Sequence, residues 1–170
     1  MFTLTTIEII TRVAVAIGLG TALGLERTWA GKTAGMRTYS MITLGSTIFV
    51  IISNTIIQSL TNPLIATPLM IPAAVITGTG FIGAGLIIFQ ENKISGLTTA
   101  AGLWVASGIG IASGFGFFSV AIIATVGALI IFTLMWFVEN LLKKYSYNLT
   151  QERNMIHQKL EDLNKDSDNN

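Results

Sequence analysis

The stretch Leu25–Ser40, L-E-R-T-W-A-G-K-T-A-G-M-R-T-Y-S, separates two long apolar runs and decides the fold. We call it the hinge segment. It carries four charged residues, Glu26, Arg27, Lys32 and Arg37, whereas the runs on either side carry almost none. A charge at the centre of a bilayer costs about 3 kcal/mol or more, so these residues should lie at a membrane face. Loops rich in Lys and Arg stay in the cytoplasm, which predicts that this face is the cytoplasmic one.

The composition is that of an integral membrane protein. Of 170 residues, 51% are hydrophobic and 11% are charged, and the mean hydropathy is +0.67. A soluble domain carries about 25% charged residues. The chain has no cysteine, which excludes disulfides, thiol catalysis and cysteine-ligated metals. No basic stripe alternates with aromatic residues, so we expect the lipid bilayer, and no nucleic acid, as a partner.

We expect an all-α membrane protein with a bundle of about five transmembrane helices. The first begins at the capping box Thr5-Thr6-Ile7-Glu8. The apolar runs have the length that spans a bilayer and cover approximately residues 7–25, 38–57, 69–89, 97–115 and 117–138.

The distribution of basic residues predicts the orientation of these helices. The first and third loops carry bases, the second and fourth carry none, and the last run is followed by Lys143 and Lys144. An outside N-terminus and a cytoplasmic C-terminus satisfy every loop. A four-helix alternative, with the last two runs merged or one run re-entrant, would place Lys93 and the Lys143–Lys144 pair on opposite faces.

We divide the chain into a transmembrane bundle, residues 1–138, and a short polar cytoplasmic tail, residues 139–170. In the tail, Ile156, Leu160 and Leu163 have the spacing of an amphipathic helix. Such a helix can lie on the membrane or dock on a partner.

Charged and hydroxyl residues near the helix ends form a candidate functional cluster. Glu8 and Arg12 lie four residues apart on one helical face, either as an ion pair at the interface or as a polar element facing the bundle interior. We expect Arg37 to pair with Glu26 or with the start of the fourth helix, which Ser95, Thr98 and Thr99 can cap. The members of the cluster are Glu8, Arg12, Glu26, Arg27, Arg37, Thr38, Thr98 and Thr99.

Glycines at regular spacing predict close helix packing, because small residues let helix backbones approach in lipid. The segment Gly78–Gly83 also spells G-x-G-x-x-G, but it lies in an apolar run without the strand and acidic partner of a dinucleotide site. A locally broken helix lining a small polar cavity is the alternative for this segment. The expected packing positions are Gly80, Gly83, Gly85, Gly102, Gly110 and Gly114.

No catalytic constellation is visible in the sequence. The single histidine, His157, falls in the polar tail without metal-ligand spacing around it. No paired carboxylates or Glu-x-x-His motif occur near the membrane. We therefore expect a protein that is not an enzyme and that holds no metal or cofactor.

Four motifs in order resemble the MgtC/SapB family of bacterial inner-membrane proteins, and the resemblance covers residues 7–138. The motifs, with a tryptophan that follows them, are Gly24–Arg27, Ala34–Thr38, Gly80–Gly85, Gly96–Ala101 and Trp104. The Glu8…Arg12 pair also fits the family. The segment from Asn62 to Pro72 lacks the acidic residue and arginine that members often carry there, and the tail is shorter than the cytoplasmic domain of many members.

The resemblance implies a small helical bundle in the bacterial cytoplasmic membrane. It also implies magnesium homeostasis, stress adaptation and a virulence-related role, namely coping with low magnesium, acid or the phagocyte interior. In one branch of the family that role is regulatory and restrains the membrane ATP synthase. Two hypotheses follow: a regulator or adaptor that binds another membrane complex, and a small channel or transporter for Mg²⁺ or protons. Self-association is open under both.

Overall fold

The computed structural model describes residues 4–59, 69–90, 93–138, 141–142 and 153. The chain forms two compact units, Met1–Leu129 and Ile130–Asn170. The elements are, in order, α1 (Thr6–Trp29), α2 (Met36–Ser59), α3 (Met70–Ala84), β1 (Ile88–Gln90), β2 (Lys93–Ser95), α4 (Leu97–Phe115) and a fifth helix, Phe118–Val138.

Five helices occur in the described residues, as predicted. Four of them are long and apolar enough to cross a membrane: α1, α2, α4 and the helix Phe118–Val138. These helices agree with a multi-pass membrane protein. The outside and cytoplasmic positions of the termini stay a prediction, as does the division at residue 138. The expected tail helix lies outside the described residues.

The third helix is shorter than predicted. We expected it to reach Phe89, but α3 has 15 residues and ends at Ala84. At 1.5 Å per residue this is about 22 Å, less than the hydrocarbon core of about 30 Å. The chain then forms the antiparallel β1–β2 hairpin, in which Ile88 lies opposite Ser95. The β-branched and aromatic residues of Ile87–Phe89 favour this extended backbone over another helical turn.

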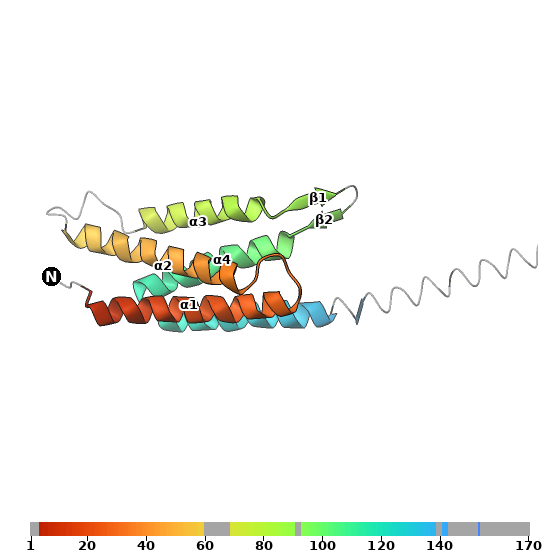
Figure 1. Cartoon of the computed structure of the whole chain (residues 1–170), viewed down its shortest axis with the longest axis horizontal. Helices are drawn as coiled ribbons and strands as arrows, with labels where there is room; N and C mark the ends of the chain where they lie inside the picture. Colours follow the sequence, from red (N-terminus) through yellow and green to blue (C-terminus); the bar gives the residue numbers. More distant parts are fainter. Residues whose placement is uncertain (1–3, 60–68, 91–92, 139–140, 143–152, 154–170) are drawn as a thin grey trace, which may run out of the picture. The chain divides into compact units, whose positions relative to one another are not determined.

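Three helices make the core of the first unit. Helix α2 packs on α1 and α4, α1 also contacts α4, and α3 lies against α4 and α2 (Figure 1). The buried apolar side chains include Ala16, Leu23, Tyr39, Val50, Leu103, Ala106 and Ile109.

The predicted capping box at the start of α1 is confirmed. The Glu8 backbone N–H donates to Thr5 Oγ1 at 3.3 Å, and the Thr5 backbone N–H donates to the Glu8 carboxylate at 2.7 Å. Each residue thereby satisfies a backbone donor that the first helical turn leaves free.

The start of α4 differs from the prediction. We expected hydroxyl caps from Ser95, Thr98 and Thr99, but the N-cap is Gly96 and no side chain bonds there. Gly96 has φ +89°, a conformation that favours glycine, and a Cβ on it would overlap the Leu86 backbone. The backbone at Leu86, just before the hairpin, therefore lies directly against the N-cap of α4.

Candidate functional site

The hinge segment places a buried arginine at the end of α1. Arg27 is only 3% exposed, although a lone charge is costly to bury. Its Nε donates to the carboxylate of Glu26, whose side chain is 20% exposed. The pair thus compensates a charge that the packing of α1 holds inside the protein.

The same end of the bundle joins three helices through Tyr39. This side chain, in the first turns of α2, is fully buried. Its hydroxyl lies 3.5 Å from the Thr99 carbonyl oxygen at the start of α4, a long hydrogen bond. Glu26 and Arg27 are near enough to interact electrostatically with Tyr39. We call Glu26, Arg27, Tyr39 and Thr99 the hinge cluster.

Arg37 does not make the predicted contact. It lies in the first turn of α2, is exposed, and forms no hydrogen bond or ion pair with any residue that the structure describes. The predicted pairing of Arg37 with Glu26 or Thr98 is therefore wrong, because the neighbouring Arg27 takes the carboxylate. Thr38 is half-buried and Thr98 is exposed. Of the candidate functional cluster, Glu26 and Arg27 form an ion pair, and Tyr39 links Thr99 to this end of α1.

Arg12 makes the polar contact at the opposite end. Its Nη1 donates to the Gly114 carbonyl oxygen at 2.6 Å, in the last turn of α4. The last carbonyls of a helix lack partners within it, and the helix dipole favours a cation there. The guanidinium also lies beside Gly116, where a Cβ would stand 3.3 Å from Arg12 Nη2.

The contact of Arg12 selects between the two sequence interpretations. Among the described residues Arg12 forms no ion pair with Glu8, whose carboxylate instead accepts from Thr5. Arg12 points across the bundle to α4 rather than away from it. It therefore serves as the inward-facing polar element and fixes the start of α1 to the end of α4.

The glycine predictions divide between α4 and α3. Gly110 packs on α2, where a Cβ would lie 2.7 Å from Ser46 Cβ, and Gly114 packs against Val50. Gly102 is buried in α4. On α3, Gly83 is in ordinary van der Waals contact with Ala100 of α4. Gly85 contacts only the last turn of α3 itself, and Gly80 has nothing within 4 Å. No described part of the chain packs on Gly80, which is exposed, so its packing role stays a prediction.

Sequence reasoning missed the hydroxyl groups that join the core helices. Thr43 Oγ1 donates to the Ala16 carbonyl oxygen at 2.8 Å, and Thr47 Oγ1 donates to the Gly110 carbonyl oxygen at 2.7 Å. Thr28 Oγ1 accepts from the Met36 N–H and so caps α2 from the end of α1. The spacing of Thr43 and Thr47 on one face of an apolar helix could have indicated this buried stripe.

The chemistry available to this arrangement is structural and electrostatic. Charged side chains with protein partners lie at the two ends of the α1–α2–α4 core, and hydroxyls bonded to carbonyls lie between them. In the part of the chain that the structure describes, no three His, Cys, Asp or Glu side chains are grouped as metal ligands.

Comparisons with known proteins agree with the motifs. The chain is 37% identical over 123 residues to "Uncharacterized protein slr0014" of Synechocystis sp., covering 72% of this chain and 50% of that protein. It is 43% identical over 99 residues to "Putative magnesium transporter YhiD" of Escherichia coli K12, covering 56% and 46%. It is 38% identical over 86 residues to "Protein MgtC" of Salmonella typhimurium, covering 51% and 34%.

The chain thus spans half or less of the length of these relatives. No solved structure matches it. The MgtC family matches residues 13–141, a range that contains the hinge cluster, Gly110 and Gly114 and begins one residue after Arg12. By this match and by its motifs, the chain belongs to the MgtC family.

Proposed function

We propose that this chain is a regulatory or adaptor protein of the bacterial cytoplasmic membrane. It acts on another membrane complex during adaptation to low magnesium or acid, and it catalyses no reaction. The proposal extends the family membership and the name "Protein MgtC" of one relative to a specific mode of action.

The closed polar interior of the α1–α2–α4 core carries this proposal. Thr43 and Thr47 direct their hydroxyls to backbone carbonyls of neighbouring helices, and no buried side-chain polar atom among the described residues lacks a partner. Transporters instead place ionisable groups or unwound backbone near the middle of the membrane. The interior of this core is therefore built to hold helices together.

The outer surface supplies what an adaptor needs. Gly18 on α1 and Gly108 on α4 have nothing within 4 Å. Outward glycines let a helix of another membrane protein approach closely. The helix Phe118–Val138 likewise exposes large apolar side chains, among them Ile122 and Ile123.

Cross-linking in native membranes tests the adaptor role. Single cysteines at Gly18 and Gly108 can be introduced into a chain without native cysteine. We expect one reproducible adduct with another membrane protein from at least one of these positions. A buried position such as Ala106 serves as the control, and adducts with the same chain alone would contradict the proposal.

A cation or proton transporter is the second candidate. It is favoured by the short α3, which ends at Ala84 before a non-helical segment, and by the name "Putative magnesium transporter YhiD" of a relative. Purified protein in liposomes should then carry Mg²⁺ or proton flux that Glu26→Gln abolishes. Such flux would replace the adaptor proposal, whereas its absence in folded protein supports it.

We also propose that the hinge segment faces the cytoplasm and the α4 end faces outside. A cysteine at Thr33 and one at Phe117, both exposed, lie in the two opposite loops. In intact cells an impermeant thiol reagent should label Phe117→Cys and should reach Thr33→Cys only after lysis. Equal labelling of both in intact cells would contradict this orientation.

A further inference from the structure

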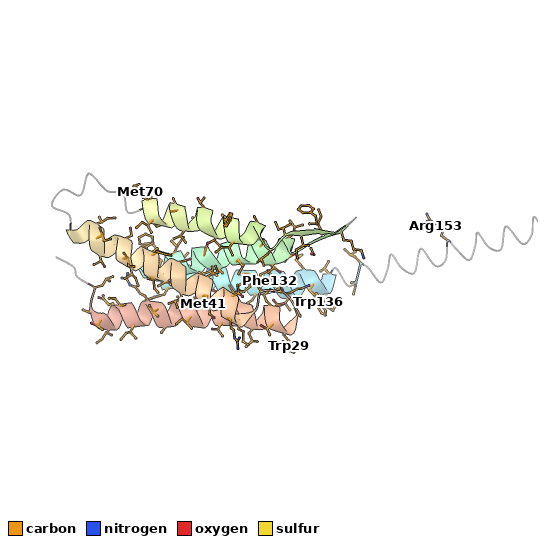
Figure 2. All side chains as sticks on the ribbon, turned by 45° about the horizontal axis from the view of Figure 1, so that its top comes forward. Trp29, Met41, Met70, Phe132, Trp136 and Arg153 are labelled. Carbon is orange, nitrogen blue, oxygen red and sulfur yellow. The ribbon has the colours of Figure 1, made fainter. Side chains whose placement is uncertain are left out.

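A long apolar groove runs between α2 and α3. It encloses about 580 Å³, within the range of about 300–1,000 Å³ typical of ligand pockets. Its walls include Met41, Gly45 and Phe49 from α2 and Val75, Gly78 and Ile82 from α3. Figure 2 labels Met41 on α2 and Met70 at the beginning of α3.

The groove is lined almost entirely by apolar side chains, and its two hydroxyl residues are Ser46 on α2 and Thr79 on α3. Thr79, its buried hydroxyl residue on α3, donates to the Val75 carbonyl of its own helix at 2.9 Å. Gly45 and Gly78 have no neighbour within 4 Å, so they deepen the groove instead of seating another part of the chain. The chemistry of the walls fits a hydrocarbon chain.

A second hollow of about 450 Å³ adjoins the groove on α2 and is lined by Met36, Arg37, Ser40 and Met41. Met41 lines both spaces, so they are neighbours on α2. The Ser40 hydroxyl is engaged with Thr21 at 2.8 Å, whereas Arg37 is exposed and pairs with no described residue. The guanidinium is thus the group in this hollow that is free to bind an anion, and its planar fork suits a phosphate.

We propose that the groove and the hollow together bind one anionic phospholipid. Its phosphate lies on Arg37 and one acyl chain follows α2 past Met41 and Gly45. From Arg37 to Phe49 the helix rises about 18 Å, close to the thickness of one leaflet, about 15 Å. The proposal is independent of the adaptor or transporter role.

Native mass spectrometry of the full chain tests the headgroup contact. The protein is released from nanodiscs of equal phosphatidylglycerol and phosphatidylcholine, and retained lipids are counted. We expect Arg37→Gln to lower the ratio of retained phosphatidylglycerol to phosphatidylcholine about fivefold, the factor that one interfacial base contributes. Lys32→Gln, a matched base outside the hollow, should change it less than about twofold.

A pair of glycine variants tests the groove. Gly78→Leu fills the groove, whereas Gly18→Leu adds the same volume on α1 away from it, and neither position has a neighbour within 4 Å. We expect Gly78→Leu to lose the retained phosphatidylglycerol while Gly18→Leu keeps it. Both variants should elute from a size-exclusion column as the parent does, because a Cβ at either position has no neighbour within 4 Å.

Three outcomes would overturn the proposal. Equal effects of Arg37→Gln and Lys32→Gln would mean diffuse attraction to the surface. Retention of the lipid by Gly78→Leu would place it elsewhere. Efficient disulfide formation between two copies carrying Phe49→Cys in native membranes, with no retained phosphatidylglycerol, would show that a second copy fills the groove.

Discussion

Helices α3 and α4 carry similar glycine-rich sequences and use them in opposite ways. On α4, Gly110 and Gly114 lie directly against α2, so a Cβ would stand less than 3.0 Å from that helix. On α3, Gly78 and Gly80 have nothing within 4 Å, and Gly78 lines the groove beside α2. The same small residues thus bring two helices together in one place and open a groove in the other.

A stripe of small residues in lipid therefore permits close helix packing without requiring it. It allows a close approach but does not select a neighbour. In the α1–α2–α4 core, polar contacts determine which helices pack together. They are the hinge cluster at one end, the Arg12–Gly114 contact at the other, and threonine hydroxyls that donate to carbonyl oxygens between them. Apart from Gly83, the predicted α3 glycines lack a neighbouring helix. Four measurements test this contrast between the two helices.

The largest effect is expected for Arg27→Ala. It leaves the Glu26 carboxylate without the buried partner seen here, and breaking such a pair costs about 3–5 kcal/mol. Arg37→Ala, an exposed control in the same segment, should change the free energy of unfolding by less than about 0.5 kcal/mol. The yield of monodisperse protein in detergent and its thermal midpoint report the difference. A greater loss for the Arg37 variant would contradict our assignment of the structural arginine.

Gly110→Leu and Gly80→Leu test the glycine comparison directly. The first inserts a side chain into the α2 backbone, and overpacking costs about 1–3 kcal/mol or more. The second points into open space and should leave the thermal midpoint unchanged. Similar losses in both variants would show that α3 is packed as tightly as α4.

Arg12→Gln should have an intermediate effect. It removes a hydrogen bond from a charged donor to the Gly114 carbonyl, a contact worth about 1.5–3 kcal/mol. Glu8→Gln, which alters the exposed carboxylate that accepts from Thr5, should have a smaller effect, because Gln also fits the capping box. Thermal unfolding in detergent compares the two. If the Glu8 variant is less stable than the Arg12 variant, the capping box contributes more to the stability of this end of the bundle than the α1–α4 contact does.

The smallest effect concerns the threonine stripe. Thr47→Val removes the bond from α2 to the Gly110 carbonyl of α4, and interhelical hydrogen bonds in membranes average about 0.6 kcal/mol. Thr77→Val is the matched control, because Thr77 Oγ1 donates to Ala73 of its own helix on α3. A double-mutant cycle of Thr47→Val with Gly110→Ala should show coupling. Additive losses would mean that the two helices do not act together at this point.

Several features followed from the sequence because they depend on local chemistry. The capping box needs only Thr5 and Glu8 three residues apart. The lengths of the apolar runs predicted five helices. The charged residues between the runs predicted a loop in the hinge segment and a second loop before Gly96. The end of α3 was missed because an apolar run continues to Phe89 whether its backbone is helical or extended.

The sequence by itself determined that this protein is a membrane bundle of the MgtC family, with its charges at the ends of its helices. The burial of Arg27 and the exposure of Arg37 depend on the tertiary structure alone. So does the contact that Gly110 and Gly114 of α4 make with a neighbouring helix and that Gly78 and Gly80 of α3 lack. In lipid, outward and inward helix faces are both apolar, so the hydrophobic pattern cannot tell them apart. Contacts between distant parts of the chain make that choice.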